Sequence, residues 1–308
     1  MSTPEYAIGV DIGGTKIAFA LVNRSGQALD TYQLPTNAAN GPDAVVDAAA
    51  EGVRRLADRA TGSVAGVGVG VPGFVDFEHG IVRNAVNLGW DEVPLGSRLS
   101  AATGLPVRVQ NDVNAILDGE LRFGSARGCR TVALAAIGTG VGGAFAVDGK
   151  VASGAFGSAG EIGHTAIMSP RRQCRCGLYG CVEAYLSGVG LTSGVAEHRA
   201  EFPASPLAQG EPAARDIVAA ADAGDPLALA VIADALEAWR AVVAVFAMVI
   251  NPERIVIGGG LGHALAPRLL EAGQQALNER VLPVARGLTF VLAEVESPAV
   301  GAAAAAFA

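Results

Sequence analysis

The chain has 308 residues, of which 51% are hydrophobic and 17% charged, and its formal net charge is −8. This length and composition are typical of a globular α/β protein with a large core, and two lobes are the expected arrangement. Lysine and arginine form no cluster, so nucleic acid is not an expected partner. The longest apolar stretch, Ala241 to Ile250, is far shorter than a membrane span of roughly 20 residues. We therefore expect a cytoplasmic protein with no membrane partner.

The expected elements alternate between strands and helices. The chain opens with a strand, a glycine turn and a second strand over 6–22, then a helix over 42–60 and a buried strand over 64–71. A loop over 72–90, a helix near 97–103, a short strand over 106–110 and a helix from Asn111 follow. Later come a strand over 131–137, a glycine turn and a second strand that ends at Val147. A long helix over 226–250, a strand over 254–257, a helix after Gly260 and a helical tail complete the chain. This order predicts a mixed or parallel sheet with covered faces.

Glycine-rich turns follow three of the expected strands. Any one of them is explained about as well by a simple hairpin turn, but three such turns favour a nucleotide-phosphate site, because glycine lets the backbone approach a polyanion. The first two belong to similar strand–turn–strand units and indicate a duplicated lobe. Asp11 is a candidate for holding hydrated Mg²⁺. The candidate phosphate-binding residues are Asp11, Gly13, Gly14, Thr15, Lys16, Gly138, Thr139, Gly140, Gly259 and Gly260.

Asn111 and Asp112 stand where an expected strand ends and a helix begins. A carboxylate here lies near the positive end of the helix and can point into a cleft. Asp112 is therefore a candidate general base, which would accept a proton from a sugar hydroxyl during phosphoryl transfer. Simple capping of the helix explains the dipeptide equally well.

Three of the four cysteines lie within eight positions, in the segment Cys174-Arg-Cys176-Gly-Leu-Tyr-Gly-Cys181. With His164 they make a Cys₃His set, which is enough for a closed tetrahedral zinc site. A redox pair is the alternative, but a third thiol nearby favours a metal. The fourth cysteine, Cys129, is isolated and is interpreted as a thiol without a role.

Glu161 and Glu183 flank this cysteine segment. Folding of the segment around zinc would bring both carboxylates to one place, where they could bind a polyol, since sugar hydroxyls favour carboxylate, amide and imidazole partners. The candidate set is Asn111, Asp112, Glu161, His164 and Glu183, although each residue alone is more often a solvated surface group.

These motifs resemble the ROK family of bacterial sugar kinases, and its glucokinases in particular, over nearly the whole chain. Residues 11–16, 138–143 and 258–260 resemble its two phosphate motifs and its adenosine loop, and residues 174–183 are similar to its CxCGxxGCxE zinc motif. The resemblance implies the actin-like ATPase fold, in which two duplicated RNase-H-like lobes flank a central cleft that holds ATP and hexose. We expect an N-terminal lobe of residues 1–111 plus 298–308, a C-terminal lobe of residues 112–297, and a homodimer or homotetramer.

The resemblance also implies roles for single residues. Asp112 corresponds to the catalytic base, and Asn111, Glu161, His164 and Glu183 correspond to residues that hold the sugar, with His164 serving zinc as well. Gly73 and Asn87 resemble the remaining sugar contacts. The chain departs from the family's usual sequence at two places. The segment before Trp90 lacks the proline often found there, which bears on sugar selectivity, and Gln110 stands where many relatives have glutamate.

The leading hypothesis is an ATP- and Mg²⁺-dependent hexokinase, with glucose as the first candidate substrate and with structural Zn²⁺. Mannose, fructose, N-acetylmannosamine and N-acetylglucosamine remain alternatives, because one or two contacts separate them. A sugar-sensing repressor of the same family would need a helix-turn-helix module, and only residues 1–5 precede the first expected strand. An actin-like assembly ATPase would not need the cysteine segment, and a polyphosphate donor would favour a basic track.

Overall fold

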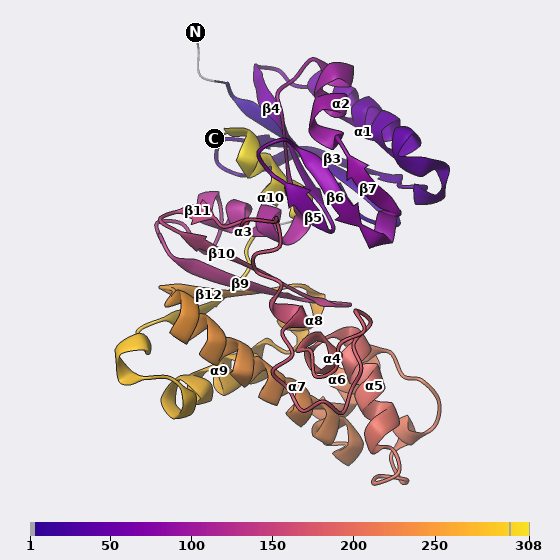
Figure 1. Cartoon of the computed structure of the whole chain (residues 1–308), viewed down its shortest axis with the longest axis vertical. Coiled ribbons are helices and arrows are strands. Elements are labelled where there is room, and N and C mark those ends of the chain that lie inside the picture. Colours follow the sequence, from indigo (N-terminus) through magenta and orange to yellow (C-terminus); the bar gives the residue numbers. More distant parts are fainter. Residues whose placement is uncertain (1–3, 296, 308) are drawn as a thin grey trace. The chain divides into compact units, whose positions relative to one another are not determined.

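The computed structural model describes residues 4–295 and 297–307, which fold into two compact units (Figure 1). The first unit comprises the described parts of 1–130, 144–159 and 294–308, and the second comprises 131–143 and 160–293. Among the described residues, no helix combines the length and the apolar character that crossing a membrane requires.

The first unit is built on a five-stranded sheet with the order β3-β2-β1-β4-β8. Its strands are β1 (Tyr6–Ile12), β2 (Lys16–Asn23), β3 (Ala28–Pro35), β4 (Val64–Val71) and β8 (Val107–Asn111). The strands β1, β2 and β3 pair antiparallel, whereas β1, β4 and β8 pair parallel. The predicted mixed sheet is therefore confirmed.

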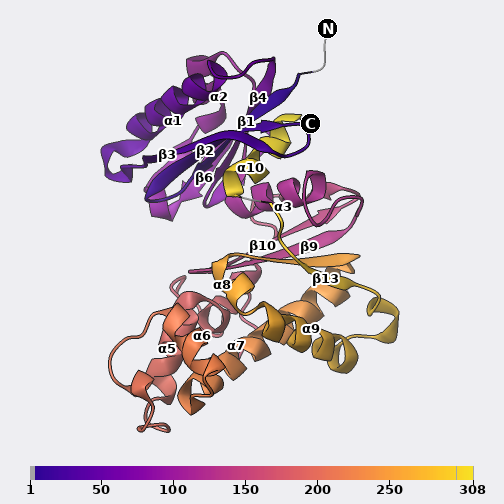
Figure 2. The same ribbon diagram turned by 180° about the vertical axis from the view of Figure 1, so that it is seen from behind.

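The alternation of side chains along β1 separates two faces of this sheet. Ile8, Val10 and Ile12 are fully buried in the core that α1 (Gly41–Ala57) and α2 (Leu95–Thr103) cover. Ala7 and Gly9 lie on the opposite face, against α10 (Pro298–Ala303). Since side chains alternate with a period of two, Asp11 belongs to this second face as well. Figures 1 and 2 show α10 and α1 on opposite sides of the sheet.

The alanine-rich C-terminal helix packs directly on strand backbone. A Cβ atom added to Gly9 would lie 1.7 Å from the carbonyl oxygen of Ala299, and one added to Gly68 would lie 1.8 Å from that of Ala302. Each of these glycines therefore leaves room for α10, and the small residues of α10 allow the close approach. The predicted helical tail is confirmed, with a 3₁₀ turn over Ala304–Phe307 at its end.

Glu120 secures the return of the chain to this unit. It is fully buried near the end of α3 (Asp112–Arg122), and its two oxygens accept hydrogen bonds from Ser125 and from the backbone N–H groups of Glu294 and Val295 at 2.7–2.8 Å. A buried carboxylate is tolerated when its oxygens are satisfied in this way.

The segment predicted as a loop over 72–90 instead forms most of a small antiparallel sheet. It consists of β5 (Phe74–Asp76), β6 (Ile81–Ala85) and β7 (Trp90–Val93). The prediction was wrong because strands of three to five residues are too short for a clear alternation of apolar and polar residues. Val75, Val82 and Trp90 are buried, and they join the core under α1 and α2.

The second five-stranded sheet has the order β11-β10-β9-β12-β13. Its strands are β9 (Val132–Ile137), β10 (Val141–Val147), β11 (Lys150–Val151), β12 (Arg254–Gly258) and β13 (Thr289–Leu292). When each sheet is numbered from its own first strand, both have the order 3-2-1-4-5. The duplication predicted from the glycine turns is thus present in the topology.

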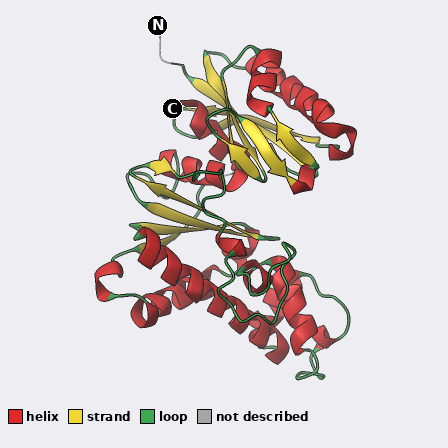
Figure 3. Ribbon diagram, viewed as in Figure 1, coloured by secondary structure: helices red, strands yellow, loops and turns green. Residues whose placement is uncertain are grey.

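Helices make up most of the second unit after residue 183 (Figure 3). They are α4 (Glu183–Leu186), α5 (Gly188–His198), α6 (Ala214–Asp222), α7 (Pro226–Val245), α8 (Gly260–Ala264) and α9 (Ala266–Arg280). The predicted helix to Ile250 is α-helical only to Val245 and ends in a π-helical turn over Phe246–Ile250. Trp239 of α7 donates a hydrogen bond to the Leu269 carbonyl of α9 at 2.8 Å.

The compact units differ from the expected lobes in three segments of the expected C-terminal lobe: α3 with the residues up to 130, residues 144–159, and the described residues from 294 to 297 belong to the first unit. The expected boundary at residue 112 assigned this helix to the C-terminal lobe, but it belongs to the first unit. The physical reason is its contact with α10, where a Cβ atom added to Gly119 would lie 2.5 Å from the Cα atom of Gly301. Two glycines allow the helices to approach this closely, and the sequence separation of 182 positions hides the pairing.

Candidate active site

The first glycine turn connects β1 to β2, where it was predicted. The N–H of Gly13 donates to the Lys16 carbonyl at 2.9 Å, and the Thr36 hydroxyl donates to the Gly13 carbonyl at 2.6 Å. These bonds hold the turn, while Gly14, Thr15 and Lys16 remain exposed. An anion could therefore approach this turn and the Lys16 ammonium.

Asp11 and Asp112 lie on either side of Gly70 in β4. A Cβ atom added to Gly70 would lie 3.4 Å from the Cα atom of Asp112 and 3.9 Å from an oxygen of Asp11. Burial and the nearby Asp112 charge raise the pKa of Asp11 to about 6, although Lys16 opposes the shift. Burial also raises the pKa of Asp112, against hydrogen bonds from Val113 and Asn111. Two carboxylates in one partly buried place are a common setting for acid–base chemistry.

Asn111 caps α3 and fixes its start. Its side-chain oxygen accepts from the N–H groups of Val113 and Asn114, at 2.9 and 3.2 Å, and its amide nitrogen donates to the Gly73 carbonyl at 3.1 Å. The capping interpretation is therefore correct for Asn111. Gly73 has a φ of +99°, and an added Cβ atom would lie 2.1 Å from the Asn84 carbonyl oxygen, so only glycine fits.

Asn87 lies beside the first glycine turn. A Cβ atom on Gly14 would lie 3.4 Å from the Asn87 carbonyl oxygen. Asn87 is exposed and belongs to the 3₁₀ turn Val86–Leu88 between β6 and β7. The first unit thus brings together the phosphate candidates around Gly14, the candidate base and the sugar candidates Gly73, Asn87 and Asn111.

The second glycine turn connects β9 to β10 and touches Glu183. One oxygen of Glu183 accepts a hydrogen bond from the Val141 N–H at 2.9 Å, and a Cβ atom on Gly140 would lie 2.4 Å from the same oxygen. The other oxygen accepts from the Cys174 thiol at 3.7 Å. Glu183 therefore connects the glycine turn to the cysteine segment, a role that the sequence did not indicate.

The four candidate zinc ligands come together. The ligand atoms of His164, Cys174, Cys176 and Cys181 all lie within 4.8 Å of one another. The sulfur of Cys174 is 3.6 Å from Nδ1 of His164, and the sulfurs of Cys176 and Cys181 are 3.7 Å apart. Glu161 is exposed and precedes the 3₁₀ turn Ile162–His164 that positions the imidazole.

These distances fit a tetrahedral zinc ion. With Zn–S bonds of about 2.3 Å and Zn–N bonds of about 2.1 Å, two sulfurs of a tetrahedron lie about 3.8 Å apart and a sulfur and nitrogen about 3.6 Å apart. Burial raises the pKa of Cys174 and, to about 12, that of Cys181, whereas a hydrogen bond from the Leu178 N–H lowers the pKa of Cys176. Because zinc binds thiolates, metal affinity at this cluster should fall with decreasing pH.

The third glycine turn joins β12 to α8, where it was predicted. Gly259 has a φ of +81°, and an added Cβ atom would lie 2.3 Å from the Ile137 carbonyl oxygen. Gly260 has open space around it. The Gly259 carbonyl lies 2.9 Å from Nδ1 of His263, one turn later in the chain.

Arg172 is a site residue that sequence reasoning missed. It lies two positions before Cys174, its side chain is only 6% exposed, and its guanidinium lies 4.3 Å from the centre of the Tyr185 ring. It pairs with Glu197 of α5 and Asp234 of α7, and it donates to the Ala184 and Gly190 carbonyls. The one signal in the sequence is an arginine beside a turn segment, which is common on surfaces.

We expect Arg172→Met to loosen the cysteine segment, because it removes the buried arginine that pairs with Glu197 and Asp234 and leaves these carboxylates only the more exposed Arg171 as an arginine partner. Breaking a buried pair costs about 3–5 kcal/mol, and partial exposure of both acids favours the lower end. The melting temperature should fall and the KM for sugar should rise more than the KM for ATP, measured by thermal shift and steady-state kinetics. Arg175→Gln, which changes an exposed arginine of the same segment, is the control. Equal changes in both variants would contradict the assignment.

Comparisons with known proteins agree with this geometry. Residues 7–307 match the model of the ROK family. The chain is 36% identical over 304 residues to a glucokinase of Halalkalibacterium halodurans, which covers 96% of this chain and 92% of the relative. A ROK family glucokinase from Streptomyces griseus, solved in complex with glucose and AMPPNP, is 30% identical with a TM-score of 0.77, covering 97% and 98% of the two chains. A ROK hexokinase from Thermus thermophilus is 29% identical with a TM-score of 0.82, covering 97% of each.

The duplicated sheets and the glycine turns define the class of the protein, which is that of the actin-like ATPase fold. Within that class the chain belongs to the ROK family. The predicted family and fold class are both confirmed.

Proposed function

We propose that the protein phosphorylates a hexose at its 6-hydroxyl with ATP, and that glucose is the main substrate. It is an ATP-dependent sugar kinase, as the similarity to glucokinases over 96% of the chain supports. The observation that carries the chemistry is Asp112, a partly buried carboxylate of raised pKa at the first position of α3, beside Asp11.

Asp112 acts as the general base in this proposal. It accepts the proton of the 6-hydroxyl while the oxygen attacks the γ-phosphorus of ATP, and the bond from this phosphorus to the β,γ-bridging oxygen breaks to release ADP. The carboxylate is held by its bond from the Val113 N–H at 2.9 Å, so its position does not depend on the sugar. A general base must be ionised to act, and a raised pKa makes it a stronger base at neutral pH.

The glycine turns hold the phosphates. The turn residues around Gly14, together with Thr139 and Gly140, would donate to phosphate oxygens. Gly138 would shape its turn, because its N–H donates to the Gly140 carbonyl at 2.9 Å. Gly259 and Gly260 would lie against the adenosine. Asp11 fits Mg²⁺, because this ion is usually held by one or two carboxylates together with substrate phosphates. When bound, Mg²⁺ supplies charge neutralisation on the phosphates.

The sugar hydroxyls are assigned to Gly73, Asn87, Asn111, Glu161, His164 and Glu183. Zinc at the four-ligand cluster would be structural and not catalytic, since a closed tetrahedral site leaves no coordination position for substrate. Its four ligands hold the segment on which Glu183 begins α4. The homo-oligomer and the cytoplasmic location remain predictions.

A panel of sugars tests this proposal. With ATP and Mg²⁺, glucose should give a kcat/KM at least tenfold above those for mannose, fructose, N-acetylmannosamine and N-acetylglucosamine, measured with a coupled assay for ADP. Polyphosphate in place of ATP should give little turnover. A preference for an N-acetylhexosamine would reassign the substrate, and no turnover with any sugar would refute the kinase.

A further inference from the structure

A cavity of about 570 Å³ lies within the first unit, beside the edge strand β8 and the helix α3. Three residues of β8 line it, Arg108, Gln110 and Asn111, and so do Asn114 and Asp118 of α3. Lys150 contributes from the β10–β11 hairpin. Because residues two apart share a strand face and residues four apart share a helix face, one side of each element faces the cavity. The pairing of β8 with α3 therefore determines which polar side chains line the cavity.

The inner part of the cavity offers buried polar groups. Asn114 is 6% exposed, and its side-chain oxygen accepts no hydrogen bond from any residue that the structure describes. Gln110 is 4% exposed, and its side-chain nitrogen donates to no residue that the structure describes. Burial raises the pKa of Asp118 to about 6. A buried acceptor without a donor is unfavourable. A ligand with hydroxyl or amide hydrogens would remove this cost.

The rim of the cavity has a different character. Arg108 and Lys150, the two basic side chains of the lining, are both exposed there. Phe77, which is 44% exposed, supplies a flat apolar surface. Such a site would hold an anionic group at its mouth, hydroxyl groups inside and a hydrocarbon face against the ring.

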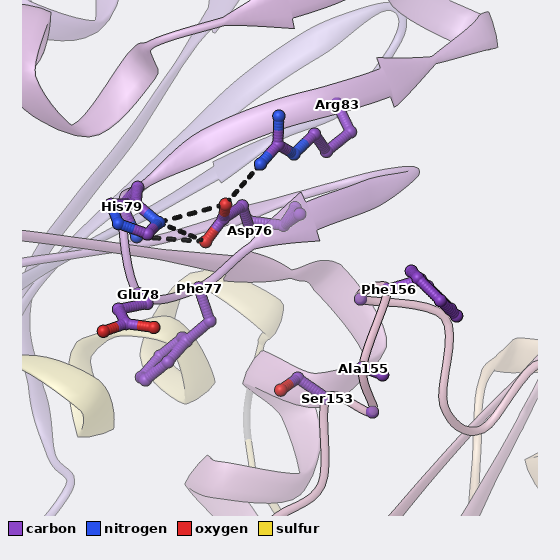
Figure 4. Close-up of a pocket in the computed structure, with 11 residues that line it drawn as sticks. Asp76, Phe77, Glu78, His79, Arg83, Ser153, Ala155 and Phe156 are labelled. Carbon is purple, nitrogen blue, oxygen red and sulfur yellow. Dashed lines mark hydrogen bonds and ion pairs between the residues drawn. The ribbon is translucent and has the colours of Figure 1, made fainter.

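The neighbouring cavity of about 650 Å³, shown in Figure 4, lacks these properties among the residues that the structure describes. It shares Val75, Phe77, Ser153 and Gly157 with the β8 cavity, but Asp76, His79 and Arg83 in its lining are paired with one another. Asp76 bonds to His79 at 3.0 Å and to Arg83 at 2.6 Å. No buried acceptor without a partner faces it. The β8 cavity is therefore the better candidate for a ligand.

We propose that the β8 cavity binds a hexose monophosphate, whose hydroxyl groups donate to Asn114 and Asp118 and whose phosphate pairs with Arg108 and Lys150. Asn111, the cap of α3, also lines the cavity, and Asp112 is the next residue. A ligand there contacts the helix that carries the proposed base. The inference that such a ligand regulates turnover rests on the proposed function, whereas the inference that the cavity binds it does not.

The experiment is a calorimetric titration of the full chain with glucose 6-phosphate, in the presence of saturating glucose and AMPPNP so that the substrate sites are filled. One ligand per chain should bind. The double variant Arg108→Gln, Lys150→Gln should weaken binding at least tenfold, and Asn114→Leu, of similar volume, should weaken it about tenfold. Arg127→Gln removes an exposed charge of the same unit away from the cavity lining and should bind like the parent chain.

The proposal is overturned if glucose 6-phosphate does not bind under these conditions, if all the variants bind it equally, or if inorganic phosphate alone binds as tightly. Asp112→Asn should retain the binding, since this variant keeps the cavity. If glucose and AMPPNP fail to bind in their own titrations, the proposed function is wrong. The binding of glucose 6-phosphate to the cavity variants still tests whether the β8 cavity is a ligand site.

Discussion

Replacing Asp112 by asparagine should lower kcat by about 10²- to 10⁴-fold, the usual contribution of a positioned general base. Asparagine has the same shape, and its side-chain oxygen can still accept from the Val113 N–H, so α3 should begin at the same residue. The KM for glucose and the melting temperature should change little. Steady-state kinetics and thermal shift on the purified variant measure these effects.

The control for this variant is Asp47→Asn, which removes an exposed carboxylate from α1. Its kcat should equal that of the parent chain. Turnover of Asp112→Asn within a factor of about three of the control would rule out Asp112 as the base, because a shift that small is far below the range for general-base catalysis.

The pH dependence gives a second measure of the same residue. Burial raises the pKa of Asp112, and the ionised form is the active one, so kcat/KM should be constant at higher pH and should fall as the pH decreases through the raised pKa. The midpoint should therefore lie above the ordinary range of an aspartate.

Removing one zinc ligand should have the second largest effect. Cys176→Ser should reduce bound zinc from about one per chain to nearly none and should raise the KM for glucose at least tenfold. The physical reason is that Cys174 and Glu183 are in contact at 3.7 Å, so a disordered cysteine segment displaces a sugar candidate. Cys176 is exposed, so the change creates no cavity in the core. Elemental analysis and kinetics provide the readouts.

Cys129→Ser is the matched control, because Cys129 lies outside the cluster. It should keep its zinc and its KM. Parent protein without zinc, or a Cys176→Ser variant that still holds one ion per chain, would contradict a four-ligand zinc site. Treatment with a strong chelator should reproduce the effect of the variant on the parent chain, and added zinc should reverse it.

Local patterns in the sequence were enough to predict several features of the fold and of the candidate site. The glycine turns after β1, β9 and β12 could be predicted because each follows an apolar strand, and in the third turn Gly259 has a φ of +81°, which favours glycine. The Cys₃His cluster could be predicted because its three cysteines are close in the chain and His164 lies ten positions before them. The capped start of α3 at Asn111 had its own local signal.

Only the tertiary structure decided the features that join distant parts of the chain. The assignment of α3 to the first unit depends on Gly119 meeting Gly301, and the burial of Glu120 depends on two N–H groups at 294 and 295. The Arg172 network and the β8 cavity likewise arise from residues tens of positions apart. Periodicity and capping report which face of an element is buried, but they carry no information about which other element covers it, because that choice is made by packing.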